Sequence, residues 1–483
     1  MAAAPPLEDN KIYALINYED PYVQPLIVAA IQKHFPPETI ELISELNATP
    51  SKSSRVLQWV QYESINFEHV FQHSTTSLAN AYVIRKALIR KHYLATTVAN
   101  WIVKHPESVL AKHVKPSVEF EVDYAEFLDD ALVEAWELHE SWRRSKGNGG
   151  KDWWILKPGM SERGQGIRLF SSEEELTRIF EGWDPESDDE EEEGEDDDTR
   201  SDAGFVSEAS GKEEVGGDGK DGGGIITSQL RHFIAQPYIH PPLLLAPPSS
   251  SSSSPSATHK FHIRTYVLAT GALQIHVYHP MLALFAARPY TPPSSTTLEG
   301  HAEDALRAHL TNTCLQETGD REGSVGSFWN LPDRIPEQPL NPSSDGAKEA
   351  STPLPPNANW KEEVYKQICA ITGEVFEAAA RGMSIHFQAL PNAFEIFGLD
   401  FMISIEKNGE LRTWLLEVNA FPDFRQTGEE CKGVVEGLMV EVVRVGIKPF
   451  FGETSGEADG PDGASHRNGK GLVKVLDIDL GRR

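Results

Sequence analysis

Residues 394–422 read FEIFGLDFMISIEKNGELRTWLLEVNAFP, and the rest of the chain is organised around this segment. It contains two apolar runs rich in β-forming residues, Phe397–Ile405 and Leu411–Val418. Between them lies an Asn-Gly pair, which is typical of a tight hairpin turn. We therefore predict two antiparallel strands that are joined by this turn.

Three oxygen-bearing side chains lie in the predicted hairpin. Asp400 falls inside the first strand, while Glu417 and Asn419 end the second strand and share a face because they are two residues apart. Mg²⁺ takes one or two carboxylates and completes its shell with water and phosphate oxygens. The alternative is a hairpin whose polar residues face water. Apolar residues flank each acid, and a buried acid is costly unless it is paired or coordinated, so we favour a metal site.

The negative charge of the chain is concentrated in one segment. The 483 residues carry a net charge of −29, and residues 184–221 hold 18 acidic and 3 basic side chains, a net of −15. We predict that residues 184–224, which are acidic, glycine-rich and nearly without apolar side chains, form a disordered insertion. The remainder has no basic stripe for nucleic-acid phosphates, which argues against a general nucleic-acid-binding protein.

Cysteine usage and hydropathy indicate the cellular compartment. Cys314, Cys369 and Cys431 are far apart and odd in number, so they predict no disulfide framework or zinc site, and a reducing compartment. The N-terminal residues MAAAPPLEDNK lack the basic and apolar regions of a signal peptide. No run of about 18 apolar residues indicates a membrane span. We expect a cytoplasmic protein that has no membrane contact and is a monomer.

The N-terminal part of the chain predicts a small open α/β unit. Lys11–Asn17 is typical of a strand, Val23–His34 of a helix and Ile40–Leu46 of a second strand. Further along, the apolar spacing of Thr75–Ile102 predicts one long helix, and Tyr124–Lys146 predicts another.

A short basic cluster falls within the first of these long helices. Lys86 lies there together with Arg85, Arg90 and Lys91. Two interpretations stay open: a solvated helix face, which is the commoner case, or a site at which Lys86 contacts a phosphate.

Residues 153–170 read WWILKPGMSERGQGIRLF and predict a strand, a glycine-rich loop and a second strand. A P-loop would lead into a helix, so this pattern favours a flap that covers phosphates. Gly164 and Gly166 allow backbone N–H groups to approach a phosphate, and Lys157 at the end of the first strand supplies a positive charge. The alternative is an ordinary surface turn.

Two later stretches add polar groups that suit an anionic ligand. The segment Gln236–Ile239 has the composition of a linker whose backbone can hydrogen-bond an adenine edge. Residues 259–268, HKFHIRTYVL, predict a strong strand that carries Lys260, His262 and Arg264 on one face. A strand with a wet polar face is the alternative.

The C-terminal half completes the expected α/β pattern. Leu273–Ala286 continues the sheet, Trp360–Arg381 and Glu429–Val445 have the apolar spacing of long helices, and Gly471–Leu480 is typical of a final strand.

Taken in order, these motifs resemble the ATP-grasp fold and, more narrowly, the tubulin-tyrosine ligase family. The phrases that carry the resemblance are WILKP with RGQGI, PPLLL, HKFHIRTYVL, HLTNTC, FGLDFM and WLLEVNAFP. The resemblance implies an α/β (α+β) architecture, in which an N-terminal α/β domain precedes two domains that enclose Mg·ATP. The expected division is an N-terminal domain of residues 1–75, a flap-bearing domain of 76–240, a hairpin-bearing domain of 241–450 and a tail of 451–483.

The resemblance also implies a reaction. ATP phosphorylates a carboxylate on a protein tail, and the amine of a free amino acid then attacks the acyl phosphate, giving an amide, ADP and phosphate. By default the acceptor is the acidic C-terminal tail of tubulin, and the donor is tyrosine or another amino acid. The work of such an enzyme is mainly positioning and charge neutralisation.

Individual roles follow from the same resemblance. Lys260, Arg264 and Glu417 would act on the reacting groups, Lys260 between nucleotide and acceptor and Arg264 on a substrate carboxylate, where lysine could not replace its fork geometry. Asp400, Glu417 and Asn419 would bind Mg²⁺. The nucleotide would be bound by Lys86, Lys157, Gly164, Gly166, Gln236, Tyr238, Ile239 and Lys260.

Three positions depart from the family pattern. Pro237 stands where the family usually has lysine, His262 where it usually has aspartate, and Leu284 where a substrate-binding arginine is expected. The ATP and Mg²⁺ elements are thus nearly complete, while the acceptor and amino-acid elements are altered. Two alternatives stay open: an ATP-binding interaction protein without ligase activity, and a small-molecule carboxylate–amine ligase.

Overall fold

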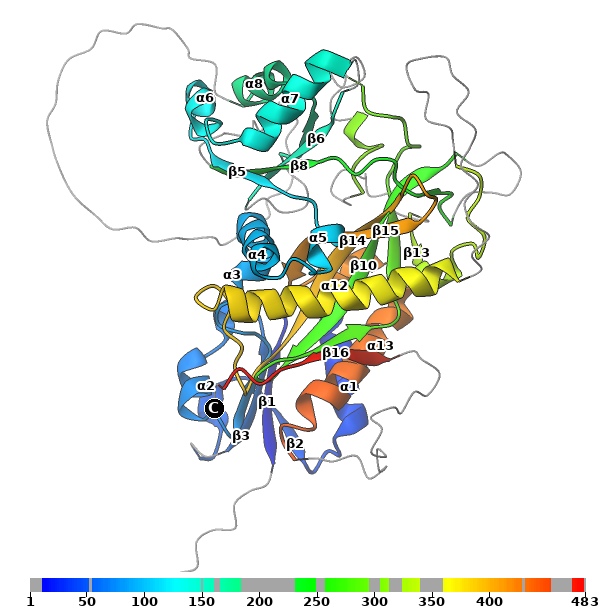
Figure 1. The fold of residues 1–483 in the computed structure, drawn as a ribbon. Coiled ribbons are helices and arrows are strands. Elements are labelled where there is room, and N and C mark those ends of the chain that lie inside the picture. The colour runs from blue at the N-terminus through cyan, green and yellow to red at the C-terminus, as the bar shows by residue number, and fades with distance from the viewer. Residues whose placement is uncertain are drawn as a thin grey trace, which may run out of the picture.

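The computed structural model describes residues 11–51, 54–148, 151–159, 166–183, 231–248, 257–294, 305–311, 324–338, 359–427, 431–452 and 471–481. These residues form three β-sheets with helices on their faces (Figure 1). The predicted insertion at residues 184–224 lies outside the described residues. The mixed α/β architecture that we expected is confirmed.

The first sheet is parallel and confirms the predicted β-α-β start. Its strands, in spatial order, are β2 (Ile40–Ile43), β1 (Ile12–Asn17), β3 (Arg55–Val60) and β4 (Ser77–Ala79). The helix α1 (Val23–His34) connects β1 to β2 and packs its apolar side against a C-terminal helix. This packing joins the first sheet to the rest of the molecule.

A small antiparallel sheet forms the upper part of the molecule in Figure 1. Its strands, in spatial order, are β5 (Val118–Glu121), β8 (His232–Pro237), β6 (Trp154–Pro158) and β7 (Arg168–Phe170). The pairing of β6 with β7 confirms the predicted strand–loop–strand pattern. The loop residues 160–165, which include Gly164, lie outside the described ranges.

The helix α8 (Glu173–Glu181) follows this sheet, and side chains cap its start. The hydroxyl of Ser172 accepts a hydrogen bond from the backbone N–H of Glu175 at 3.2 Å. The carboxylate of Glu175 in turn accepts one from the backbone N–H of Ser171 at 2.6 Å. The two bonds satisfy N–H groups at the start of the helix.

The large sheet is built around the strand β10. Its main path consists of β13 (Val325–Ser327), β12 (Leu282–Phe285), β10 (His259–Thr270), β11 (Gln274–Tyr278) and β16 (Leu472–Asp477). β9 (Leu244–Leu245) and β14 (Phe394–Ile405) also pair with β10, and β15 (Leu411–Ala420) pairs with β14. The antiparallel β14–β15 pair confirms the hairpin on which the sequence analysis rests.

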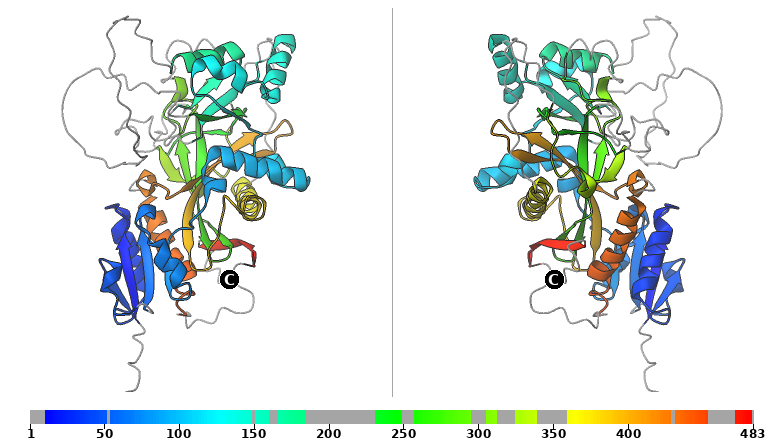
Figure 2. Two further views of the ribbon diagram at one scale, coloured as in Figure 1. Left: turned by 90° about the vertical axis from the view of Figure 1, so that its left-hand side faces the viewer. Right: turned by 90° about the vertical axis from the view of Figure 1, so that its right-hand side faces the viewer.

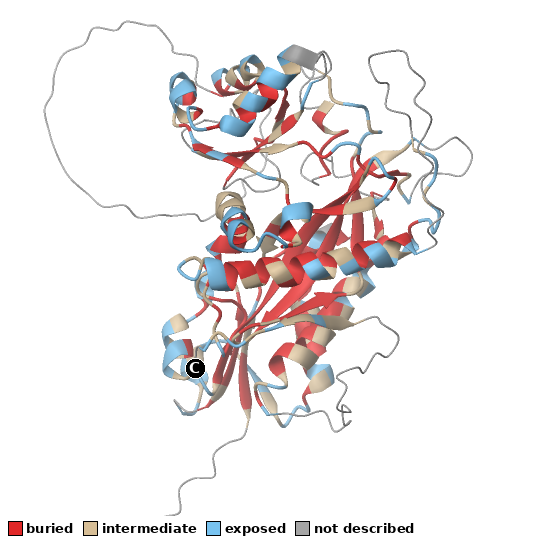
Figure 3. Cartoon of the chain, viewed as in Figure 1, coloured by how far each residue is buried: buried red, intermediate tan, exposed pale blue. Residues whose placement is uncertain are grey.

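Helices cover both faces of the large sheet. α12 (Trp360–Gly382) packs on one face, while α13 (Lys432–Val442) and a π-helical turn at Val443–Ile447 pack on the other, beside the first sheet (Figure 2). Almost all of β10 and β14 is therefore buried (Figure 3). Because of this burial, the interpretation of β10 as a strand with a wet polar face is wrong. Among the described residues, no helix has the length and apolar character that a membrane span requires.

Short helical segments connect these layers. They are η1 (Leu46–Ala48), η2 (Tyr62–Ser64), α2 (Phe67–Gln72), α5 (Leu110–His113), η5 (Phe328–Asn330) and η6 (Phe424–Thr427). The side-chain amide oxygen of Asn66 caps α2 by accepting a hydrogen bond from the backbone N–H of His69 at 2.9 Å.

The prediction of one helix over Thr75–Ile102 is wrong. This segment contains β4, an irregular stretch, α3 (Lys86–Ile89) and α4 (Lys91–Lys104). Its backbone is held by distant partners: Glu395 accepts a hydrogen bond from the N–H of Tyr82 at 3.1 Å and pairs with Arg85 at 2.8 Å. These tertiary contacts outweigh the helical preference of the local sequence.

The prediction of one continuous helix over Tyr124–Lys146 is also wrong. The segment divides into η3 (Ala125–Phe127), α6 (Leu128–Ala131) and α7 (Trp136–Asn148). The same hydrophobic core takes side chains from both sides of the break, namely Leu128, Leu132, Ala135 and Leu138. The bend between α6 and α7 thus allows both helices to cover the small sheet.

Candidate active site

A cavity lies between the small sheet and the large sheet, where β6 and β8 face β10, β14 and β15. It has a volume of about 70 Å³. Its charged and polar lining residues are Lys115, Lys157, Gln236, Tyr238, Lys260, His262, His309, Thr311, Asp400 and Glu417. Residues predicted separately from the flap, the linker, the basic strand and the hairpin therefore meet in one place, with Ile239 also in the wall.

Two carboxylates stand side by side at the floor of this cavity. Asp400 on β14 is the direct cross-strand partner of Glu417 on β15, next to an irregularity in the strand pairing. The amide of Asn419 donates a hydrogen bond to Glu417 Oε1 at 3.1 Å. Burial by itself would raise the pKa of Glu417, but Lys91, this amide, Lys157 and Arg264 lower it to about 2. Glu417 therefore keeps its negative charge at neutral pH.

Arg264 pairs with Asp400 through both arms of its guanidinium group. Nε donates to Asp400 Oδ1, and Nη2 donates to Oδ2 at 3.0 Å. Both side chains are buried, so the pair is shielded from water. Its fork geometry is the one that arginine forms with carboxylates. Arg264 was expected to bind a substrate carboxylate, and in this structure it binds a carboxylate of the chain itself.

Lys157 is held by the predicted linker glutamine. Its Nζ donates to Gln236 Oε1 at 2.8 Å, and Gln236 Nε2 donates to Ser117 Oγ at 2.7 Å. Burial lowers the pKa of Lys157 to about 8, against the attraction of Glu417. The hydrogen bond therefore orients the ammonium group. Because the pKa is lowered, Lys157 loses its proton more readily than an exposed lysine does.

Lys260 lies deeper in the cavity and contacts Tyr238. Its Nζ donates to Tyr238 Oη at 3.0 Å and lies 4.1 Å from the centre of the tyrosine ring. Tyr238 Oη also lies 2.9 Å from Nδ1 of His309. Burial lowers the pKa of Lys260 to about 7, and the nearby charge of Lys157 acts in the same direction.

Two of the three departures from the family pattern are neighbours in the sheet. His262 on β10 and Leu284 on β12 face each other directly in the strand register, and both are buried. His262 bonds to the hydroxyl of Thr311 through Nδ1, while its Nε2 lies 3.7 Å from Asp400 Oδ1. The imidazole thus stands beside the carboxylate pair.

The sequence matches a known family over most of its length. The model of the tubulin-tyrosine ligase family matches residues 71–340 and 347–455, which include every lining residue named above. The chain belongs to the tubulin-tyrosine ligase family. The resemblance that the motifs carry is thus confirmed.

Similar proteins support this family membership. A probable tubulin–tyrosine ligase of Schizosaccharomyces pombe is 40% identical over 451 residues, which cover 92% of this chain and 93% of the relative. The probable tubulin–tyrosine ligase PBY1 of Saccharomyces cerevisiae is 38% identical over 462 residues, which cover 94% of this chain and 54% of PBY1. The chain therefore spans about half the length of PBY1.

A solved structure agrees with the fold. The crystal structure of the C-terminal domain of K. lactis Pby1 is 31% identical, with a TM-score of 0.61, and the match covers 97% of this chain and 99% of that domain. That protein is described as an ATP-grasp enzyme that interacts with the mRNA decapping enzyme Dcp2. The present chain, which belongs to the same family, is likewise an ATP-grasp enzyme, as its sequence motifs predicted.

Two residues of this chain that were predicted to bind the nucleotide, Lys86 and Gly166, are not among those that line the cavity. Lys86 is exposed at the start of α3 and does not line the cavity. Gly166 lies just beyond the undescribed loop and has a φ of +71°, a conformation that favours glycine. The roles of Lys86 and Gly166, like that of Gly164, stay predictions.

Two cationic side chains beside the site, those of Lys91 and Lys115, were not predicted from the sequence to belong to it. Lys91, at the start of α4, has its Nζ 3.8 Å from Glu417 Oε2. Lys115 lines the cavity and lies with Nζ 3.8 Å from the ring centre of Trp414. Lys91 belongs to the basic cluster that was noticed in the sequence, but choosing between Lys86 and Lys91 required the break between α3 and α4.

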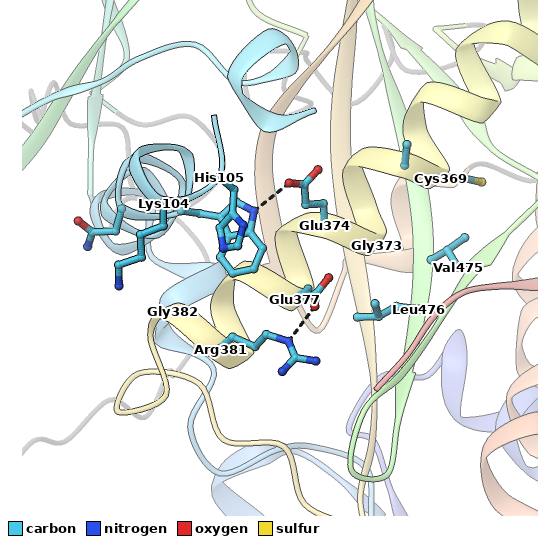
Figure 4. Close-up of a pocket in the computed structure, with 13 residues that line it drawn as sticks. Lys104, His105, Cys369, Gly373, Glu374, Glu377, Arg381, Gly382, Val475 and Leu476 are labelled. Atoms are coloured by element: carbon cyan, nitrogen blue, oxygen red, sulfur yellow. Dashed lines mark hydrogen bonds and ion pairs between the residues drawn. The ribbon is translucent and has the colours of Figure 1, made fainter. Parts of the chain in front are cut away.

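A larger hollow of about 740 Å³ lies elsewhere, between α4, α12 and β16 (Figure 4). Three of its charged side chains have partners at the site: Arg381 Nε lies 2.7 Å from Glu377 Oε1, and Glu374 accepts a hydrogen bond from Trp101 Nε1 at 2.8 Å. None of the predicted phosphate- or metal-binding residues lines it. We therefore assign the chemistry to the smaller cavity.

The hairpin residues have the donor set of a Mg²⁺ site. Asp400, Glu417 and Asn419 bring carboxylate and amide oxygens to adjacent strands, and Glu417 stays ionised. Within the described ranges, no group of three or more His, Cys, Asp or Glu side chains could hold a metal by itself. A cation here would need further oxygens from water or phosphate, which is the usual habit of Mg²⁺. The residues fit the ion on this criterion.

Proposed function

We propose that this ATP-grasp enzyme joins a free amino acid to a carboxylate of an acidic protein tail, with conversion of ATP to ADP and phosphate. The tubulin C-terminal tail is the first acceptor to test, and tyrosine is one of several candidate donors. The names of the fungal relatives motivate this choice of acceptor and donor. We also propose that the protein is cytoplasmic and acts as a monomer.

One observation carries the proposal: the buried Asp400 and the half-buried Glu417 lie side by side on adjacent strands, with cationic side chains around them. Lys91, Lys157 and Arg264 all lower the pKa of Glu417, and Lys260 lines the same cavity. A ligase that activates a substrate carboxylate with ATP must hold that carboxylate close to the phosphates and to a divalent cation. Cations and anions placed in a water-poor cavity before substrates arrive serve that need.

In this proposal the parts of the cavity have different tasks. Lys157 and Lys91 bind phosphates, and the linker Gln236–Ile239 holds the adenine. Asp400, Glu417 and Asn419 would hold Mg²⁺, which when bound would supply charge neutralisation on the transferred phosphoryl group. Arg264, which pairs with Asp400 in this structure, would contact a substrate carboxylate. Lys260 lies where the nucleotide and the acceptor carboxylate meet.

The test is a direct search for the product. Tubulin and proteins of a cell extract are incubated with the enzyme, Mg·ATP and isotope-labelled amino acids, and modified peptides are identified by mass spectrometry. We expect a labelled amino acid on an acidic tail with wild-type enzyme and none with Glu417→Gln. A single modified peptide identifies both acceptor and donor.

A second function is favoured by the three departures from the family pattern and by the Arg264–Asp400 pair. In this alternative the chain binds ATP without ligase activity and acts through a protein partner, as K. lactis Pby1 is described to interact with Dcp2. Nucleotide binding with no ADP release across the full panel of tails and amino acids would establish this alternative and exclude the first.

The pH dependence of nucleotide binding tests the two cavity lysines. Lys157 has a pKa of about 8 and Lys260 one of about 7, so each is an ammonium group below its pKa and neutral above it. We expect ATP affinity to fall as the pH rises from about 6 to about 9, by about tenfold for each charge lost. Exposed lysines stay charged in this range because their pKa is about 10.4.

Isothermal titration calorimetry at several pH values measures this effect. The matched control is Lys157→Met, which should bind ATP more weakly at low pH and lose the part of the pH dependence that lies near pH 8. An affinity that stays constant over the whole range would show that neither lysine contacts the nucleotide.

A further inference from the structure

One ring nitrogen of the cavity residue His262 has no hydrogen-bond partner among the described residues. The side chain lines the cavity and is buried, with 3% of the residue exposed, and the unpartnered atom is Nε2. Oδ1 of Asp400 lies 3.7 Å from this nitrogen, which is too far for a hydrogen bond. Because a buried polar atom without a partner costs free energy, such an atom in a cavity indicates a ligand.

The strands determine where this nitrogen lies. His262 and Arg264 are two residues apart on β10, so their side chains share a face of the sheet. Arg264 is the direct cross-strand partner of Asp400 on β14. On the other side of the imidazole ring, Nδ1 is hydrogen-bonded to Oγ1 of Thr311, which also lines the cavity. The Thr311 contact orients the ring and leaves Nε2 beside Asp400.

The spacing of His262 Nε2 and Asp400 Oδ1 suits two ligands of one cation. Bonds from zinc to imidazole nitrogen or carboxylate oxygen are about 2.0–2.2 Å long, so two such ligands lie at most about 4.4 Å apart. The observed 3.7 Å falls within this limit. A phosphate oxygen is the alternative partner for Nε2, but Asp400 and its cross-strand partner Glu417 are both acidic. Two carboxylates near the imidazole favour a cation over an anion.

We propose that His262 Nε2 and Asp400 Oδ1 bind one divalent cation together, and that the site therefore prefers a first-row transition ion to Mg²⁺. This inference rests on the proposed function, in which a divalent cation accompanies ATP. Imidazole nitrogen is a ligand for transition ions, whereas Mg²⁺ is bound through oxygen atoms. The described residues contain no group of three or more His, Cys, Asp or Glu side chains that could hold a metal by themselves, so water and phosphate oxygens complete the shell.

Two neighbours of His262 influence this site. When Nδ1 carries the ring proton and donates it to Thr311, the lone pair of Nε2 is free for a cation, and a bond of this kind commonly orients a metal-binding histidine. Arg264 Nε donates to Asp400 Oδ1, so the guanidinium and the cation compete for this oxygen. The family usually has aspartate where this chain has His262, and the replacement exchanges an oxygen ligand for a nitrogen ligand.

Pulsed electron paramagnetic resonance of bound Mn²⁺ tests the nitrogen ligand without turnover. The full chain is loaded with Mn²⁺ and a non-hydrolysable ATP analogue, and the echo modulation by nitrogen nuclei is recorded. We expect the modulation of a directly bound imidazole in the wild-type protein and its loss in His262→Gln. A wild-type spectrum without imidazole modulation would overturn the proposal, even if the variant does not fold.

The matched control for this experiment is His276→Gln. His276 on β11 is also buried, and its Nδ1 likewise has no hydrogen-bond partner among the described residues. It does not line the cavity, so the modulation should be unchanged in this variant. Equal loss of the signal in both variants would show that a general disturbance of the protein, and not the removal of a ligand, causes the loss.

The choice between cations is a second test. Dissociation constants for Mn²⁺ and Mg²⁺ are measured by isothermal titration calorimetry with the same ATP analogue. We expect the wild-type protein to bind Mn²⁺ more tightly by a factor on the order of 10 to 100. His262→Asp restores an oxygen ligand and should lose most of this preference, while His276→Gln should keep it. The same ratio of constants in wild type and His262→Asp would contradict the role of His262 as a ligand.

These results separate the inference from the proposed ligase function. Imidazole modulation without amide product for any acceptor and donor would support the cation site and reject the ligase function. Amide product without imidazole modulation would leave the ligase function in place and reject His262 as a ligand. A failure of Mn²⁺ to bind in the presence of the ATP analogue would also reject the inference.

Discussion

Glu417→Gln is expected to lower ATP consumption on the order of a thousandfold. Glutamine keeps the size of the side chain and removes its charge. Glu417 is the anion that faces Lys91, and it also attracts Lys157 and Arg264. Without it, three cations lose their shared counter-charge, and the proposed Mg²⁺ site loses its most firmly ionised ligand. Steady-state ADP release at saturating ATP measures the effect.

The matched control for this prediction is Glu377→Gln. Glu377 likewise pairs with a cationic side chain, that of Arg381, but the pair is partly exposed and spans one helical turn of α12. Pairs of this kind contribute on the order of 0.5 kcal/mol to stability, so activity should not change. Near-normal ATP consumption by Glu417→Gln would contradict the assignment of the hairpin as the centre of the reaction.

Arg264→Gln is expected to lower the free energy of unfolding by about 3–5 kcal/mol. Arg264 contacts both carboxylate oxygens of Asp400, and both side chains are buried. Removing the guanidinium leaves a negative charge in a cavity with little water. Urea denaturation followed by tryptophan fluorescence measures the loss, and Arg381→Gln on the surface of α12 serves as control.

A double variant separates charge from packing. Asp400→Asn together with Arg264→Gln removes both charges at once, so most of the lost stability should return. If the double variant is as unstable as Arg264→Gln, the loss comes from packing around the side chains and the interpretation as a stranded carboxylate is wrong.

The Arg264–Asp400 pair also bears on function. A cation that binds Asp400 competes with the Arg264 guanidinium for the same two oxygens. If Mg²⁺ occupied Asp400 in the proposed reaction, Arg264 would become available to a substrate carboxylate.

Short-range sequence patterns were enough to predict the elements that neighbouring residues specify. The β14–β15 hairpin follows from two apolar runs around an Asn-Gly turn, and the start of α8 follows from its capping pattern. The strand–loop–strand around Lys157 was predictable for the same reason. Side chains within a few residues of each other set these structures, so the order of residues contains what is needed. Because the motifs are ordered along the chain, the family also followed from them.

Which side chains meet depends on contacts between residues far apart in the sequence. Arg264 and Asp400 are 136 residues apart, and their pairing depends on the register of β10 with β14. The break between α3 and α4 likewise depends on Glu395, which is far away in the sequence. That break places Lys91 rather than Lys86 beside Glu417. Local propensities are worth a fraction of a kcal/mol per residue, whereas leaving one member of a buried ion pair without its partner costs about 3–5 kcal/mol, so the distant partners prevail.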